Sequence, residues 1–452
     1  MVAEAVKHAR PGDWIEGRGW HQEKWTRPPS PNVEGFPQHD ALSKVSPNNP
    51  VVLTHASGHA VFANAKAMEL AGVAAETPNP PGGEILKDRR GKPIGVFRET
   101  AQGFISGALA IWQRSKTPAE LMADRRKEID HAIDECIRKG ITSFQDAGTS
   151  FETIDLYKQY VTEGRMGVRL WVMVRQPNGV LRAKLPGYKV VGLGDNRLTV
   201  AAIKVTADGA LGSRGAWLLE PYADAPNSTG LNTVPMESIT ETARIAMENG
   251  VQLAVHCIGD RANREVLDVY EAAFKASPGK KDLRWRIEHA QHISAADIPR
   301  FGQLGVIASM QGVHATSDAP YVLARLRSQR AEEGAYVWQK LMKTGAIVSN
   351  GTDAPVEAID PLPNFHALVT RKTADGSVFY GDQRMSRAEA LKAYTYNAAY
   401  AAKEEQIKGS LTPGKLADVT VLSKDIMTVP EEELRTAEVT CTIIGGKVVY
   451  KK

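Results

Sequence analysis

The sequence predicts an α/β protein built on a parallel sheet of the TIM-barrel type. After residue 140, seven short apolar runs alternate with helical stretches, and such alternation is typical of a parallel sheet. Four apolar runs end on a residue that binds metal well, and the C-terminal ends of the strands are where α/β barrels place their chemistry. In chain order these four residues are Lys204, His256, His289 and Asp353.

The predicted strands span 141–147, 169–174, 199–205, 251–256, 284–289, 305–310 and 346–350. A helix is expected over 118–139, where Gly140 provides a stop signal. A complete (β/α)8 barrel has eight strands, so this count is one short. We therefore predict a barrel whose first strand is missing from the chain.

Two segments outside the alternating pattern complete the predicted domains. Residues 20–110 are rich in Pro and Gly and are read as a loop-rich insertion that contains a strand at 51–55 and a helix at 60–71. From about residue 406 the chain switches to short β runs with a Gly-Gly turn, which predicts a small β element. The expected division is a barrel over 1–405 and the β element over 406–452.

Composition excludes several classes of protein. The net charge of +4 comes from 56 basic and 52 acidic residues spread along the chain, so no nucleic-acid partner is expected. No run approaches the ~18 apolar residues of a membrane span. The N-terminus lacks the apolar core of a signal peptide, so we predict a cytoplasmic protein with a small-molecule substrate. A homodimer is left open.

The strand-end residues suit a metal site. His256 and His289 are 33 residues apart, about one strand–helix unit, so neighbouring strands would bring them side by side in register. Imidazole is a preferred ligand of zinc. Lys204 could form a carbamate, a ligand that bridges two ions, or simply be solvated or paired with an acid. Asp353 could bind metal and move protons, or cap a helix or turn.

Further candidates surround these residues. His314 follows the sixth predicted strand and is placed to meet a substrate carbonyl. His59 lies in the motif HASGH and lines a pocket or caps a helix. Asp208 opens the glycine-rich loop DGALGSRGA, which could approach a ligand, and Arg214 in that loop holds an anionic group or makes a surface ion pair. Glu288 is expected to point away from His289 because side chains alternate along a strand.

The chain resembles the amidohydrolase superfamily, in particular amidohydrolase family 3. Motifs from residue 11 to the C-terminus carry this resemblance, among them HASGHAVFANAKAMELAGV, KVTADGALGSRGAWLLEPYAD, VHCIGDRANREVLDVYE, RIEHAQHI, SNGTDAPVE and GSLTPGKLADVTVL. The resemblance implies a (β/α)8 barrel with a small β-sandwich built from both chain ends. It also implies metal ligands at Lys204, His256, His289 and Asp353, and hydrolysis of C–N bonds other than peptide bonds, including removal of formyl groups.

The chain departs from the family pattern in one respect. Family members carry a His-x-His pair on the first barrel strand, and this sequence has no such pair. We therefore expect one or two divalent ions in the family pattern, most simply zinc, but one or none in this chain, with weak or no activity. Two other functions remain open: an inactive truncated scaffold or binding protein of the same fold, and an esterase or lactonase.

Overall fold

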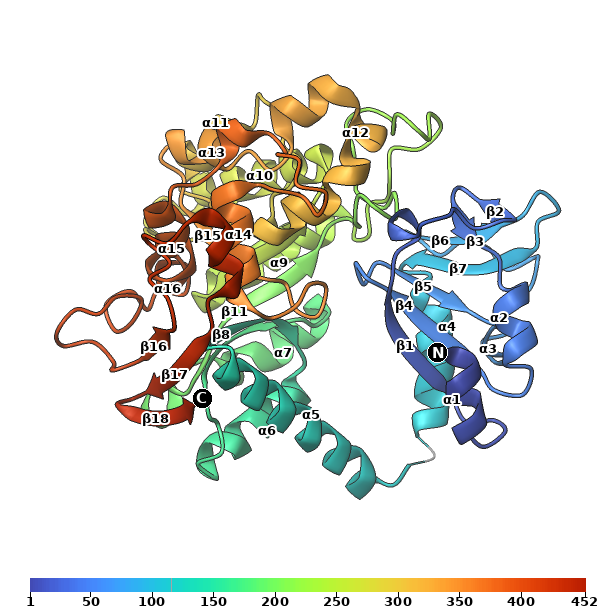
Figure 1. The fold of residues 1–452 in the computed structure, drawn as a ribbon, viewed down its shortest axis with the longest axis horizontal. Coiled ribbons are helices and arrows are strands. Elements are labelled where there is room, and N and C mark those ends of the chain that lie inside the picture. Colours follow the sequence, from blue (N-terminus) through green and yellow to red (C-terminus); the bar gives the residue numbers. More distant parts are fainter. Residues whose placement is uncertain (115) are drawn as a thin grey trace. The chain divides into compact units, whose positions relative to one another are not determined.

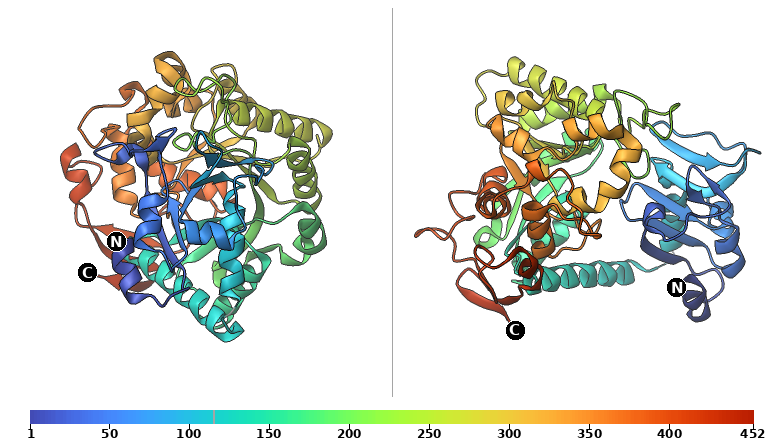
Figure 2. Two further views of the ribbon diagram at one scale, coloured as in Figure 1. Left: turned by 90° about the vertical axis from the view of Figure 1, so that its right-hand side faces the viewer. Right: turned by 45° about the horizontal axis from the view of Figure 1, so that its top comes forward.

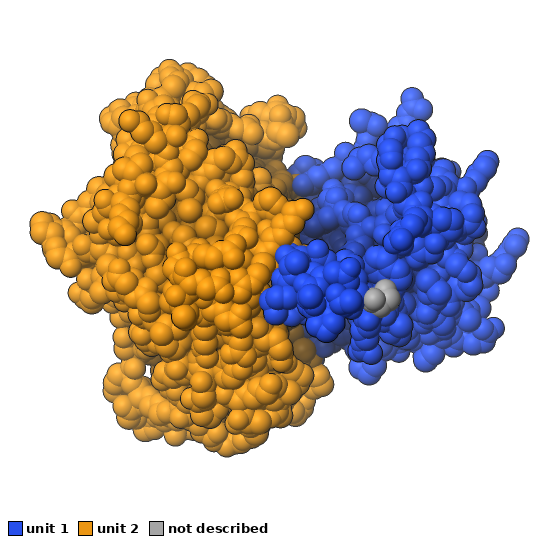
Figure 3. All heavy atoms as spheres, turned by 90° about the horizontal axis from the view of Figure 1, so that it is seen from below, with its two compact units in different colours: residues 1–125, 208–233, 320–325 blue, residues 126–207, 234–319, 326–452 orange. Residues whose placement is uncertain are grey.

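The chain folds into two units, each assembled from more than one segment of the sequence. The structure is a computed structural model that describes residues 1–114 and 116–452. Unit 1 comprises residues 1–125, 208–233 and 320–325, and unit 2 comprises residues 126–207, 234–319 and 326–452 (Figure 3). The proposed division at residues 405 and 406 stays a prediction.

A curled parallel sheet forms the centre of unit 2 (Figure 2). Its hydrogen-bonded path runs β15-β14-β13-β12-β11-β9-β8, and the antiparallel β10 pairs with β11. The strands are β8 (Ser143–Thr149), β9 (Arg169–Val174), β10 (Val190–Gly192), β11 (Leu198–Thr206), β12 (Gln252–Cys257), β13 (Arg286–His289), β14 (Ile307–Met310) and β15 (Val348–Asn350). All seven predicted strands are present, so the predicted parallel α/β architecture is confirmed.

Helices separate the strands of this sheet (Figure 1). Of these helices, α9 and α10 pack against β12. The predicted helix at 118–139 is α5, and Gly140 just beyond it has a φ of +73°, the left-handed conformation that commonly ends a helix. The helices are α5 (Pro118–Arg138), α6 (Phe151–Thr162), α7 (Asn178–Tyr188), α8 (Leu193–Asn196), α9 (Met236–Asn249), α10 (Asp260–Ala276), α11 (Ile298–Leu304), α12 (Gly312–Gly334), α13 (Trp338–Lys343), α14 (Pro361–Thr370), η2 (Gly381–Gln383), α15 (Arg387–Tyr394), α16 (Tyr396–Ala401) and η3 (Glu431–Thr436).

Alternate residues of neighbouring strands share one face of the curled sheet, which we call the inner face. Trp171, Met173, Ala202 and Ala254 lie on it and pack together with Ala402. Arg286 is on the same face, since it pairs in register with Ala254, and its guanidinium donates to the carbonyl oxygen of Ala401 at 2.5 Å. This closely packed layer precedes the C-terminal ends of the strands. The candidate site residues lie at those ends.

Unit 1 is built on a five-stranded sheet with the order β1-β4-β5-β7-β6, in which only β1 and β4 are parallel. Both faces are covered, because successive residues such as Val51 and Val52, or Val96 and Phe97, belong to different apolar clusters. Its elements are α1 (Val2–His8), β1 (Ile15–Trp20), η1 (Gln22–Lys24), β2 (Asn32–Val33), β3 (Phe36–Pro37), α2 (Asp40–Val45), β4 (Val51–His55), β5 (Ala60–Ala63), α3 (Ala65–Leu70), β6 (Gly83–Lys87), β7 (Pro93–Glu99) and α4 (Gln102–Gln113).

The predicted helix over 60–71 is wrong in its first turn. Residues 60–63 form β5, and the helix α3 starts only after Asn64, whose side chain caps it by accepting a hydrogen bond from the amide of Ala67 at 2.9 Å. All four residues of β5 are buried. Because both faces of this sheet are covered, the strand lacks the apolar–polar alternation that would distinguish it from a helix.

The C-terminal β runs form a separate antiparallel sheet in unit 2. Its strands are β16 (Val419–Leu422), β17 (Val439–Ile444) and β18 (Lys447–Lys451), and the predicted Gly445-Gly446 turn joins the last two. Among residues 1–114 and 116–452, no helix is both long enough and apolar enough to cross a membrane.

Candidate metal centre and active site

Lys204 and His256 lie on the inner face at the C-terminal ends of β11 and β12. The register pairs Lys204 with Ala254 and Thr206 with His256, so the lysine and the histidine project from the same face. Both side chains are buried, with 6% and 3% of the residue surface exposed. The parallel strands therefore bring an amine and an imidazole to one edge of the sheet, as the strand-end pattern predicts.

His289 reaches the same edge by a different backbone route. The register pairs Cys257 with His289 and His256 with Glu288, so the two histidines are one residue out of register and not directly opposite as expected. His289 has a φ of +76°, which ends the extended strand and redirects its ring. The two imidazole centroids lie 4.4 Å apart, in an edge-to-face arrangement.

Glu288 lies on the inner face, contrary to the prediction that it points away. Its register partner is His256, and because β13 departs from extended geometry at His289, residues 288 and 289 both face the site. Glu288 is 6% exposed, and among the described residues no hydrogen-bond donor reaches its Oε1 atom. A buried carboxylate oxygen in this position is chemically suited to a cation.

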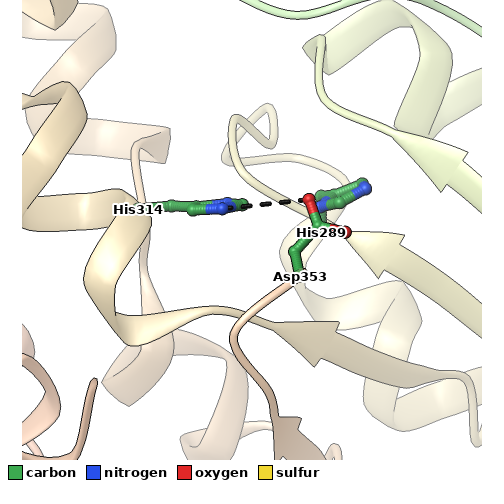
Figure 4. Close-up of side chains that lie close together, drawn as sticks. All are labelled: His289, His314 and Asp353. Carbon is green, nitrogen blue, oxygen red and sulfur yellow. Dashed lines mark ion pairs between the residues drawn. The ribbon is translucent and has the colours of Figure 1, made fainter. Parts of the chain in front are cut away.

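Asp353 and His314 complete the group (Figure 4). Asp353 follows β15 with a φ of +58°, and His314 lies in the first turn of α12. His314 Nε2 is 3.9 Å from Asp353 Oδ2, and ligand atoms of His289, His314 and Asp353 all lie within 4.8 Å of one another. Zinc–nitrogen and zinc–oxygen bonds of about 2.0–2.2 Å place ligand atoms at most about 4 Å apart, so this spacing is close to that of a metal site.

The environment of Lys204 favours its neutral form more than water does. The pKa of Lys204 is lowered to about 8, first by burial and then by the charge of Arg175, while the carboxylates of Glu288 and Asp353 act in the opposite direction. A larger share of the amine is therefore unprotonated near neutral pH. The unprotonated amine is the form that can react with carbon dioxide.

The donor set fits a divalent cation. Imidazole nitrogens and carboxylate oxygens are ligands that zinc accepts, and His289, His314 and Asp353 present such atoms within 4.8 Å of one another. His289, His314 and Asp353 are spaced to share an ion, and of the other predicted ligands His256 and Lys204 lie on the inner face at the ends of β12 and β11. The geometry of Glu288 could not be predicted from spacing, because the left-handed residue after it is not visible in the sequence.

The three predicted substrate-binding residues lie in unit 1. His59 Nδ1 is 2.7 Å from Glu99 Oε2, within hydrogen-bond distance, and the Glu99 side chain is almost fully buried. Asp208 is buried and accepts a hydrogen bond from the amide of Trp217 at 2.9 Å. Arg214 is buried and lies 2.9 Å from Asp224 in an ion pair, and its role in holding an anionic group stays a prediction.

Glu99 is a buried residue of unit 1 that the sequence did not single out. It has a φ of +50° and an almost fully buried side chain. A Cβ on Gly209 would lie 1.9 Å from Glu99 Oε1, and one on Gly215 would lie 2.2 Å from it. Gly209 and Gly215 of the DGALGSRGA loop are therefore needed to make room for this carboxylate.

Comparison with known proteins agrees with the resemblance of the sequence motifs. The profile of the Amidohydrolase family matches residues 1–450. Protein LONG AFTER FAR-RED 3 of Arabidopsis thaliana is 33% identical over all of this chain and 76% of its own. N-substituted formamide deformylase of Arthrobacter pascens is 28% identical over all of this chain and 82% of its own. The crystal structure of an uncharacterized metal-dependent hydrolase from Pyrococcus horikoshii aligns with a TM-score of 0.72 at 26% identity, covering 95% of this chain and 81% of the other.

Proposed function

The chain belongs to the amidohydrolase family and is a hydrolase acting on C–N bonds, and we propose that it cleaves N-formyl or N-acyl amides with a divalent metal ion. One observation carries the proposal: Lys204, His256, His289 and Asp353 all reach the same edge of the curled sheet, and His314 lies within 3.9 Å of Asp353. The similarity to a protein named N-substituted formamide deformylase supports the substrate class.

The proposed ion is zinc. Its ligands are His256, His289, Asp353 and Lys204, the last as a carbamate. A divalent ion at this position would supply water of lowered pKa and a positive centre for a carbonyl oxygen. The limited number of ligands supports one ion per chain, because a second ion would have too few donors for tight binding.

Each remaining residue of the site has a proton-transfer or orienting role in this proposal. Asp353 takes the proton of the attacking water and returns it to the nitrogen that leaves, which is general acid–base catalysis by a single carboxylate. His314 donates a hydrogen bond to the substrate carbonyl. His59, Asp208 and Arg214 stay proposed substrate-binding residues, and each of them has a partner within unit 1.

The scaffold proposed for this chemistry is a TIM-type barrel to which the seven-strand curled sheet contributes. The three-stranded C-terminal sheet is proposed as the β-sandwich portion over 406–452. The similarity to the metal-dependent hydrolase of Pyrococcus horikoshii supports both proposals, since that alignment covers 95% of the chain.

The test is a substrate comparison with the purified protein loaded with zinc. We expect release of formate from N-alkylformamides, with slower hydrolysis of a matched alkyl formate ester and of a lactone relative to each compound's uncatalysed rate. Preference for the ester or lactone would replace amide hydrolysis with the esterase or lactonase function. Absence of hydrolysis of all three compounds by zinc-loaded protein would contradict the proposed function and favour a non-catalytic scaffold.

A further inference from the structure

Two buried glutamines each face one imidazole of the candidate site. Oε1 of Gln311 lies 2.9 Å from Nδ1 of His289, and Nε2 of Gln291 lies 3.0 Å from Nδ1 of His314. The glutamines are 6% and 3% exposed. The two contacts look alike, but they present opposite ends of the amide to the two rings.

The amide ends differ in what they can do. An amide oxygen only accepts hydrogen bonds and an amide NH2 only donates them, whereas each nitrogen of a neutral imidazole does one or the other. His289 must therefore donate from Nδ1, which leaves the lone pair on Nε2. His314 must accept at Nδ1, which places its proton on Nε2.

The surroundings agree with both assignments. The NH2 group of Gln311 donates to the carbonyl oxygen of Ser309 at 3.3 Å, which directs its Oε1 toward His289. Nε2 of His314 faces Oδ2 of Asp353 at 3.9 Å. A proton on Nε2 of His314 is attracted by the Asp353 carboxylate. A lone pair on this nitrogen would instead be repelled by the carboxylate, because both groups only accept hydrogen bonds.

Resting on the proposed function, we propose that Gln311 and Gln291 are positioning residues that set opposite tautomers in His289 and His314. His289 then offers Nε2 as a metal ligand, and His314 offers Nε2–H as the hydrogen-bond donor to the substrate carbonyl. Although His289, His314 and Asp353 lie within reach of a common ion, only His289 and Asp353 serve as ligands. A liganding His314 would carry its proton on Nδ1, where it would meet the NH2 group of Gln291.

The direct test is the 15N spectrum of the full chain labelled at histidine, with signals assigned through His289→Gln and His314→Gln. We expect Nδ1 of His289 to be protonated and Nδ1 of His314 to be unprotonated. A protonated Nδ1 on His314 in the parent protein would overturn the proposal. This spectrum does not depend on turnover, so it can fail or succeed separately from the amide-hydrolysis assay.

A matched pair of variants gives a second readout. Gln291→Glu and Gln311→Glu introduce the same charge, but a carboxylate only accepts hydrogen bonds. In Gln291→Glu we expect His314 Nδ1 to become protonated and kcat to fall by about 10–100-fold with zinc content retained. In Gln311→Glu the acceptor is preserved, so the His289 tautomer and zinc content should stay unchanged. If the 15N signals of His314 in Gln291→Glu and of His289 in Gln311→Glu changed equally, the assignment of opposite tautomers to the two histidines would be contradicted.

Discussion

In unit 1 a buried carboxylate, Glu99, is enclosed by its neighbours, whereas in unit 2 the ligand atoms of His289, His314 and Asp353 are spaced up to 4.8 Å from one another. Glu99 has His59 at 2.7 Å, and Gly209 and Gly215 leave no space for a single added carbon. In unit 2, His314 and Asp353 are separated by 3.9 Å, beyond hydrogen-bond distance. The Glu99 side chain is enclosed by packing and has one hydrogen-bonded oxygen, whereas the side chains in unit 2 are spaced about as donors around an ion. Mutations around Glu99 should therefore lower the stability of the protein, whereas mutations at the strand ends of unit 2 should lower its activity.

The largest expected effect is on activity, at Asp353. Replacing it in Asp353→Asn removes the proton acceptor and a negative ligand, so we expect kcat for formamide hydrolysis to fall by about 10²–10⁴-fold. The melting temperature should change little, because the side chain is 29% exposed and lies at the edge of the sheet. Steady-state kinetics and thermal unfolding measure the two quantities.

Asp360→Asn is the matched control for that variant. Asp360 caps α14 by accepting from the amide of Leu362 at 3.0 Å, and Asn is about as good an N-cap as Asp. The other carboxylate oxygen of Asp360 pairs with Lys139 at 2.5 Å, so the free energy of unfolding should fall by at most about 1 kcal/mol, while kcat stays close to that of the parent. If Asp353→Asn lost stability and kept its kcat, the spaced cluster would be structural and the comparison between the two units would fail.

The next effect is on stability, at Gly209, one of the two glycines that lie against the Glu99 carboxylate. Gly209→Ala places a carbon 1.9 Å from a buried carboxylate oxygen, and relieving that overlap should cost about 1–3 kcal/mol in the free energy of unfolding. Gly103→Ala is the control, because no atom lies within 4 Å of the added carbon in helix α4 and alanine favours helices by about 1 kcal/mol. Urea unfolding checks both. A neutral Gly209→Ala would show that the cluster in unit 1 is loosely packed.

A smaller effect depends on pH and involves both units. Burial lowers the pKa of His21 in unit 1 and of His292 in unit 2 to about 3, from an ordinary value of 6.5, and nearby positive charges act in the same direction. Between pH 6.5 and 3 the unfolded chain binds a proton that the folded chain does not. Stability is therefore fully present above pH 6.5 and is lost as pH falls through this range.

His292→Phe tests this in unit 2. Below pH 6.5, over the pH range in which the protein stays folded, the free energy of unfolding should change less steeply with pH in this variant. The decrease in slope should correspond to at most about one fewer proton taken up on unfolding. An unchanged slope in His292→Phe would mean that this histidine is already protonated in the folded protein.

The strands and strand ends of unit 2 could be predicted from the sequence because they depend on local patterns. Apolar runs ending at Lys204, His256 and His289 give the position of each residue on its strand, and parallel strands bring their ends to one edge. Glu288 was misplaced because alternation assumes that the strand continues, whereas His289 has a φ of +76°. Nothing in the sequence around His289 indicates that this residue adopts a left-handed conformation.

Unit 1 could be predicted less well because its important contacts are long-range. Glu99 meets Gly209 and Gly215, more than a hundred residues away, and nothing near Glu99 in the sequence indicates them. The strand at 60–63 is buried on both faces and so carries no alternation. In unit 2 the roles of Gln291 and Gln311 could not be predicted either, since they depend on which end of the amide faces the imidazole.

The central claim is that the strand-end residues of unit 2 bind a metal ion. Its most direct test is the zinc content of the purified chain after exposure to zinc and desalting, compared between the parent and the double variant His256→Ala/His289→Ala. The account predicts about one zinc ion per parent chain and almost none in the double variant, with folding retained in both. Equal zinc in the two proteins, or none in the folded parent, would contradict it.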